Sequence, residues 1–109
     1  AANIYQAPAA IVVCANKTKA WKRPFDGKIT TDIDASILTD HMMLEATELG
    51  LGSVWICYFN PDILKEELNL PENLEPVNIL ALGYSDELDA SAERHKDMRI
   101  GMDELVSYL

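Results

Sequence analysis

The stretch that decides the fold is residues 32–59, DIDASILTDHMMLEATELGLGSVWICYF. Its first part, residues 32–48, contains no glycine or proline, and Gly50 and Gly52 follow it closely. This pattern predicts a long helix that stops at the glycines. Its last part, residues 53–59, is rich in β-branched and aromatic side chains and predicts a strand. The chain is therefore expected to combine helices with a sheet.

The predicted helix has two apolar flanks. Thr31, Asp32 and Asp34 are its candidate N-caps. Ile37 and Leu44 occupy one flank, beside charged residues. At 100° per residue, the other flank is a stripe formed by Ala35, Leu38, Met42, Ala46 and Leu49. Two flanks imply two neighbours, so the helix lies either deep in one core or between a core and a second subunit.

Further elements complete the predicted pattern. Residues 9–15 and 77–84 are apolar runs typical of buried strands, and residues 60–68 open with Asn-Pro-Asp, which predicts a capped short helix. A polar connection with an Asp-Gly turn fills residues 16–31, and residues 102–109 predict a closing helix. The order predicts a mixed α/β or α+β fold in a single domain, and we expect the α+β class. These helices are too few to cover both faces of the predicted sheet. The chain also starts without Met, so we expect residues 1–109 to be part of a longer domain.

Charge and cysteine content limit the function classes. The 109 residues include 18 acidic and nine basic side chains, a formal net charge of −9 that disfavours nucleic-acid binding. The longest strongly apolar run, residues 7–15, is far shorter than the roughly 18 residues of a membrane-spanning helix. Cys14 and Cys57 fall in strand-like runs and offer no disulfide framework, which predicts inert thiols and a cytoplasmic protein. Together with the net charge and the short apolar run, this predicts a protein without membrane or nucleic-acid partners.

The sequence contains only weak candidates for a catalytic, cofactor or metal site. Gly50 and Gly52 follow a helix rather than a strand, unlike a dinucleotide fingerprint, and Asp32 and Asp34 lack the glycine of a calcium loop. Two segments, residues 17–23 and 94–99, gather cations that could hold a phosphate. The alternative is a solvated loop for the first segment. For the second, it is surface ion pairs with Asp86, Glu87, Asp89 and Glu93.

Several segments, taken in order, resemble the nitroreductase family of FMN-dependent oxidoreductases. Residues 42–53 close the long helix, residues 54–59 form the strand, and residues 60–62 and 76–84 follow at matching intervals. Residues 7–13, Arg99 and residues 102–106 also fit. The resemblance covers nearly all of the chain and corresponds to the C-terminal half of the family's chain. The family's N-terminal helices and their arginine-serine-x-arginine motif have no counterpart here.

The resemblance implies an enzyme that passes hydride from NAD(P)H through FMN to nitroaromatics, quinones or similar small acceptors by a ping-pong reaction. It implies a homodimer with the helix of residues 32–48 at the subunit boundary, and neither a metal nor a catalytic side chain. The residues that it assigns to FMN, four along the isoalloxazine ring and two at the phosphate, are Trp55, Ile56, Cys57, Tyr58, Lys96 and Arg99. Some branches of the family carry glutamate where Cys57 stands. The alternatives are a non-catalytic dimerisation or flavin-binding module and an acidic protein-interaction domain.

Overall fold

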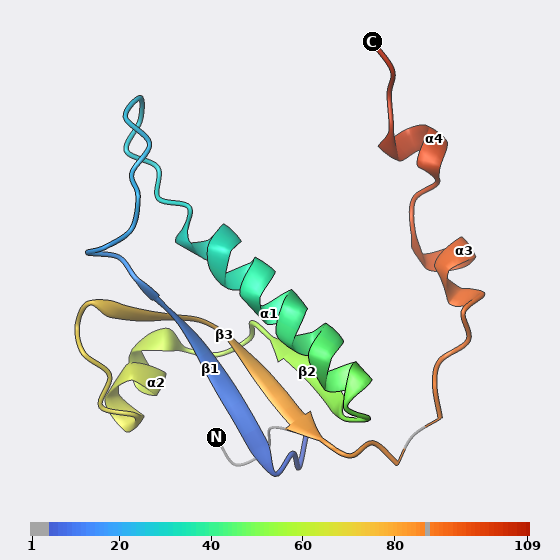
Figure 1. Ribbon diagram of the computed structural model, residues 1–109, viewed down its shortest axis with the longest axis horizontal. Helices are drawn as coiled ribbons and strands as arrows, with labels where there is room; N and C mark the ends of the chain where they lie inside the picture. The colour runs from blue at the N-terminus through green and yellow to red at the C-terminus, as the bar shows by residue number, and fades with distance from the viewer. Residues whose placement is uncertain (1–4, 87) are drawn as a thin grey trace.

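The computed structural model describes residues 5–86 and 88–109. A three-stranded sheet and a long helix form its main body, and the C-terminal segment leaves that body (Figure 1). The predicted α+β class is confirmed. The elements are β1 (Ala9–Asn16), α1 (Thr31–Glu48), β2 (Gly52–Ile56), α2 (Pro61–Glu67), β3 (Leu74–Gly83), α3 (Arg94–Met98) and α4 (Met102–Leu105).

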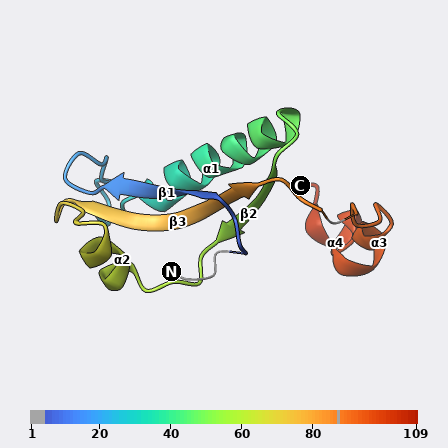
Figure 2. The same cartoon turned by 90° about the horizontal axis from the view of Figure 1, so that it is seen from below.

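The sheet is antiparallel with the order β1-β3-β2. Val12 of β1 and Ile56 of β2 both lie opposite Ile79, which shows that β3 is the central strand. Residues 78–81 of β3 are buried because β1 and β2 flank them and helices cover them. Helix α1 lies on one face of the sheet and α2 on the other (Figure 2). Residues 78–81 are thus the centre of the core.

The buried side of α1 is formed by Ala35, Thr39 and Ala46. The prediction of its apolar stripe was therefore only partly right, since Leu38 and Leu49 are 54% and 65% exposed. Small side chains let the helix backbone approach the sheet closely, and the larger leucines then lie at the rim. The second apolar flank, with Ile37 and Leu44, is exposed.

The two ends of α1 differ in how well the sequence predicted them. Thr30 holds the N-cap position and makes no side-chain cap bond, so the predicted caps at Thr31, Asp32 and Asp34 were wrong. At the other end, Gly50 has φ +76° and its N–H donates to Thr47 O over 3.0 Å. Leu51 N–H donates to Ala46 O over 2.8 Å, which completes a Schellman motif. The predicted glycine stop is confirmed.

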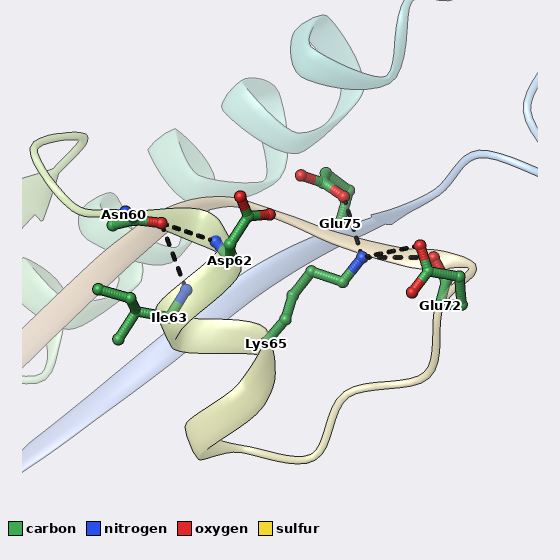
Figure 3. A network of polar contacts seen from close by, with 6 residues as sticks. All are labelled: Asn60, Asp62, Ile63, Lys65, Glu72 and Glu75. Atoms are coloured by element: carbon green, nitrogen blue, oxygen red, sulfur yellow. Dashed lines mark hydrogen bonds and ion pairs between the residues drawn. The ribbon is translucent and has the colours of Figure 1, made fainter.

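Helix α2 is fixed at both ends by side chains (Figure 3). Asn60 Oδ1 accepts hydrogen bonds from the backbone N–H groups of Asp62 and Ile63, which confirms the predicted cap. Lys65 Nζ lies 3.4 Å from Glu75 Oε2 on β3 and 3.6 Å from Glu72 Oε1. Desolvation lowers the pKa of Lys65, but the Glu75 hydrogen bond and the two carboxylate charges raise it overall. These contacts hold α2 to the start of β3.

Two predicted elements are shorter in the structure. Strand β2 ends at Ile56 rather than residue 59, because the chain turns toward α2, with Phe59 N–H donating to Cys57 O over 3.1 Å. Helix α4 covers Met102–Leu105 and not residues 102–109. Its four residues include no buried side chain, and an isolated turn without packing is marginal.

The C-terminal arm, residues 88–109, stands apart from the sheet (Figures 1 and 2). Within the described residues, neither α3 nor α4 packs against another helix or strand. The radius of gyration is 17.3 Å, whereas a compact chain of this length would have about 13 Å. The arm therefore gains no stability from the core of its own chain.

Candidate functional site

Trp55 and Ile56 are the last two residues of β2 and point to opposite faces of the sheet. Trp55 lies opposite Leu80, and Leu80 shares a face with Asn78, which contacts α1. Ile56 lies opposite Ile79 and so faces the other side. A planar ligand ring bound on one face of the sheet can contact the side chain of only one of these two residues. It must meet the other residue through its backbone.

The indole nitrogen of Trp55 is buried without a hydrogen-bond acceptor among the described residues. Burying an unpaired donor costs free energy, on the order of 1–3 kcal/mol. The Trp55 side chain lies on the face of the sheet that α1 covers. Sequence reasoning could not detect this unpaired donor, because pairing depends on which acceptors the fold brings near.

Cys57 and Tyr58 lie beyond the last pair of the β2–β3 ladder and face solvent. The Tyr58 side chain is 100% exposed. The prediction that Cys57 is a buried strand thiol was wrong, because β2 ends one residue before it. Cys14 does lie within β1, where desolvation and then the charge of Glu75 raise the pKa of its thiol.

The cations of the arm differ in their partners. Lys96 forms an ion pair with Glu93, and Arg94 donates to the carbonyl groups of Ala90 and Ser91. Arg99 has no hydrogen-bond or ion-pair partner among the described residues. The ion-pair interpretation thus describes Lys96, while the guanidinium of Arg99 is available for an anion. The pairing considered with Glu87 lies outside the described residues.

His95 lies close enough to Arg99 to sense its charge. The positive charge of Arg99, then desolvation and the charge of Arg94, lower the pKa of His95. The arm therefore concentrates positive potential at one turn of chain, although α3 itself packs on none of the described elements. The four residues around β2 and the two cations of the arm are not brought together within one chain.

The cationic segment of residues 17–23 leads into a small hairpin. Lys22 pairs with Ile29, Arg23 Nε donates to Asp26 Oδ1 over 2.8 Å, and Gly27 has φ +70° at the turn. The Arg23 hydrogen bond holds the pKa of Asp26 below its usual value. Arg23 is thus used for the turn, and the segment is a solvated loop with its lysines outside the ion pairs of the described chain.

A groove of about 670 Å³ lies at the opposite end of β2 from Cys57. Its walls include Pro8, Val54 and Tyr84, around the point where β1 begins and β3 ends. A Cβ on Gly83 would lie only 2.9 Å from Pro8 Cδ, so this close approach requires glycine. Sequence reasoning missed the groove; its only local signal is a glycine at the end of an apolar strand.

Residues 1–84 match the family model described as the nitroreductase family. The chain belongs to the nitroreductase family. A Clostridium difficile 630 nitroreductase family protein of known crystal structure is 64% identical, with a TM-score of 0.92 over 98% of this chain and 62% of its own. The resemblance inferred from residues 7–106 is confirmed at the level of family and fold.

Other relatives carry more specific names. A protein of Archaeoglobus fulgidus, provisionally named NADH dehydrogenase/NAD(P)H nitroreductase, is 40% identical over 88 residues, covering 76% of this chain and 48% of its own. A structure from Clostridium difficile R20291, described as an FMN-dependent nitroreductase, is 32% identical with a TM-score of 0.65, covering 86% of this chain and 57% of its own. The chain thus spans about half, 48%, of the length of the curated relative from Archaeoglobus.

Residues 5–86 and 88–109 contain neither a candidate membrane span nor a candidate metal site. None of the helices in these ranges has the length and apolar character needed to cross a membrane. No three His, Cys, Asp or Glu side chains gather there in a way that could hold a metal ion.

Proposed function

We propose that the protein is an FMN-dependent NAD(P)H oxidoreductase that reduces nitroaromatics, quinones or similar small acceptors. The observation that carries this proposal is the family match over residues 1–84, together with relatives named for NAD(P)H nitroreductase and FMN-dependent nitroreductase activity. Bound FMN would supply the redox chemistry, taking hydride from NAD(P)H and passing electrons to the acceptor. The protein would supply binding and orientation.

The residues present are of the types that FMN requires. The guanidinium of Arg99, which has no partner within residues 5–86 and 88–109, suits a phosphate dianion because it can donate two parallel hydrogen bonds. Lys96 could join it only by leaving Glu93. Beyond the β2 ladder, the backbone at Cys57 and Tyr58 is exposed and could donate to a flavin ring, while Ile56 would cover one ring face. These roles for Trp55, Ile56, Cys57, Tyr58, Lys96 and Arg99 are part of the proposal.

We also propose that the protein works as a homodimer. Ile33, Ile37 and Leu44 form one exposed apolar stripe on α1, spread over only about 40° of the helix circumference. An exposed stripe of this kind favours burial against another surface. A second subunit would also let the arm of one chain approach β2 of the other, which a single chain does not do. In this view, residues 1–109 are the C-terminal portion of a nitroreductase-like domain.

The free cysteines favour a reducing compartment for this enzyme. Cys57 is exposed and unpaired, and Cys14 is also a free thiol. Exposed free thiols persist in reducing compartments such as the cytoplasm. We therefore place the proposed enzyme there.

A second candidate is a non-catalytic dimerisation or flavin-binding module. It is favoured by one observation: the β2 residues and the arm cations are not brought together within one chain. Such a module would hold FMN without consuming NAD(P)H. An acidic protein-interaction domain has only the net charge of −9 in its favour.

The decisive experiment uses the protein expressed from its complete gene. Its visible spectrum is recorded before and after incubation with FMN, and any flavin released by denaturation is identified by chromatography. NADH and NADPH oxidation is then followed with a quinone and with a nitroaromatic compound. A colourless protein after FMN addition would contradict the oxidoreductase and the flavin-binding module and leave only the dimerisation module, and flavin binding without turnover would favour the flavin-binding module.

A further inference from the structure

The groove of about 670 Å³ lies at the end of the sheet where β1 and β2 begin and β3 ends. Its volume falls within the range of small-molecule sites, roughly 300–1,000 Å³. Gly52 of β2 pairs with Gly83 of β3 at its base. Ile56, the first residue assigned to the flavin beyond the indole of Trp55, lies about 14 Å further along β2. The groove is therefore separate from the proposed flavin contacts at Ile56, Cys57 and Tyr58.

The paired glycines let the neighbouring segments approach the end of the sheet. A Cβ on Gly83 would lie 2.9 Å from Pro8 Cδ, and a Cβ on Gly52 would lie 3.3 Å from Ser85 Cβ. Residues directly opposite each other in an antiparallel ladder point to the same face. Pro8 and Ser85 therefore use the space that two side chains would fill, and their segments form walls of the groove.

The wall before Pro8 has a strained backbone. Tyr5 and Gln6 have φ values of 51° and 55°, in the left-handed region that residues other than glycine rarely adopt. Each such residue costs on the order of 1–3 kcal/mol, and strain of this kind clusters at active sites and ligand-binding segments. The strained bend holds the Tyr5 side chain, which is 71% exposed, beside the groove.

The side chains around the groove suit an organic cation. Tyr5 and Tyr84 both line it, and an aromatic face attracts a cation. Among the described lining residues, Asp86 is the only charged one, and it forms no ion pair with any described residue. Five of the nine basic side chains belong to residues 17–28, beyond the opposite end of the sheet. The described lining thus offers aromatic faces and a carboxylate, and no cation for a phosphate.

We propose that this groove is a second binding site, which takes a small organic cation of the quaternary ammonium or pyridinium type. The rings of Tyr5 and Tyr84 contact the cationic group, and Asp86 supplies the counter-charge. The net charge of −9 favours the same class of ligand, because it attracts cations and repels anions at long range. The site goes beyond the proposed oxidoreductase function, since it uses none of the residues assigned to FMN.

The first test compares two probes of similar shape and opposite charge. Benzyltrimethylammonium and phenylmethanesulfonate are each titrated into the protein expressed from its complete gene, without NAD(P)H. Ligand-observed NMR should show saturable binding of the cation and an affinity for the anion that is weaker by about tenfold or more. Equal affinities for the two probes, or no binding of the cation, would overturn the proposal.

The second test locates the bound cation. Titration of ¹⁵N-labelled protein with benzyltrimethylammonium should move the N–H signals of Gly52 and Gly83, at the base of the groove. The signals of Gly27 and Gly101 should stay in place, because neither residue lines the groove. Shifts of equal size at all four glycines, or shifts at Gly27 and Gly101 alone, would show binding elsewhere and overturn the proposal.

Matched variants measure what the carboxylate and the ring contribute. Asp86→Asn should weaken binding of the cation by about fivefold, and Tyr84→Leu by about threefold. The controls are Asp89→Asn and Tyr108→Leu, the same changes at exposed residues outside the groove. All four side chains are exposed, so the fold should survive, which circular dichroism verifies. Affinities that are the same in the variants and the controls would contradict the assignment of this groove.

These measurements are independent of the proposed flavin chemistry. The groove variants should leave the FMN content and the visible spectrum of the protein unchanged, because none of the substituted residues is assigned to FMN. A colourless protein that binds the cation at Gly52 and Gly83 would support the second site and contradict only the FMN proposal. A yellow, active protein that does not bind the cation would overturn only the second site.

Discussion

The Thr39 hydroxyl of α1 hydrogen-bonds to Asn78 Oδ1 of β3 over 2.9 Å, in the middle of the core. The same hydroxyl lies 2.8 Å from Ala35 O, and because it carries one proton the two acceptors share it. Asn78 Nδ2 is buried without a partner among the described residues. This polar link between the helix and the central strand is therefore incompletely satisfied, which makes it sensitive to substitution.

The Thr39→Val variant should lose about 1–3 kcal/mol of unfolding free energy. Valine fills nearly the same volume but leaves the buried Asn78 amide with no partner on α1. Urea unfolding followed by circular dichroism measures the change from the shift in midpoint at constant slope. An unchanged midpoint would mean that the Thr39–Asn78 bond contributes nothing net.

A companion variant distinguishes the loss of the Thr39–Asn78 hydrogen bond from the cost of leaving the Asn78 amide unpaired. Thr39→Val combined with Asn78→Leu removes both polar partners and replaces them with apolar groups of similar size. This double variant should be more stable than Thr39→Val alone, since pairs of polar groups can be replaced at little cost. The difference between the observed and additive effects is the coupling energy of the two residues.

The same pair shows why the core of α1 was harder to predict than its end. The Schellman stop at Gly50 and the Asn60 cap involve residues within a few positions of one another, so the local sequence contains the whole signal. Burial of Thr39 depends on Asn78, 39 positions away, and no periodicity rule assigns a polar residue to the core on that basis. Leu38 is more apolar but lies at the rim.

The candidate site likewise combines features that the local sequence predicts with features that depend on distant contacts. Family resemblance selected Arg99, but only the structure separates it from Lys96, because pairing with Glu93 depends on side-chain positions on α3. The placement of Cys57 was missed because a strand ends where its partner stops pairing, and that partner, β3, lies later in the sequence. Contacts between distant segments are what the sequence alone could not supply.

The carboxyl group of Asp26 should titrate below the ordinary aspartate value of 3.8. The hydrogen bonds from Arg23, and then from Lys28 N–H, favour its ionised form. Its contribution to hairpin stability is therefore present above pH 3.8 and is lost as the pH falls through the lowered pKa. The titration midpoint of Asp26 is measured from the chemical shifts of Gly27, recorded at about ten pH values between roughly pH 2 and pH 6.

The Arg23→Gln variant is the control for this titration. Without the guanidinium, the pKa of Asp26 should rise toward its ordinary value and the Gly27 shifts should move with it. A midpoint unchanged by the substitution would show that Arg23 does not hold the carboxylate in solution.

Cys57 should react with iodoacetamide before Cys14. The thiolate is the reactive form, and Cys57 is exposed, whereas desolvation and the charge of Glu75 raise the pKa of Cys14. Peptide mass spectrometry on samples quenched over time gives the two rates, with the urea-unfolded protein as control, where the rates should converge. Faster labelling of Cys14 in the folded protein would contradict its partly buried position in β1.

The imidazole of His95 should titrate below its ordinary value of 6.5. Arg99 is the main cause, so Arg99→Gln should raise the midpoint more than Arg94→Gln does. Because the folded arm disfavours the charged imidazole, a stability cost develops as the pH falls below 6.5 and is complete below the lowered pKa. Proton NMR of the imidazole measures both midpoints, and equal shifts from the two variants would mean that Arg99 is not the nearer charge.

Arg99→Ala should weaken FMN binding by roughly 1.5–3 kcal/mol, the loss expected for a charge-assisted hydrogen bond to phosphate. Lys96→Ala should have a smaller effect, because Lys96 is already paired with Glu93 and would have to leave that partner. Riboflavin, which lacks the phosphate, separates the two explanations for any loss: its affinity should be the same in Arg99→Ala and the unchanged protein. Equal losses for FMN and riboflavin would mean that Arg99 supports the fold of the arm rather than the phosphate. An FMN affinity unchanged by the substitution would remove Arg99 from the site.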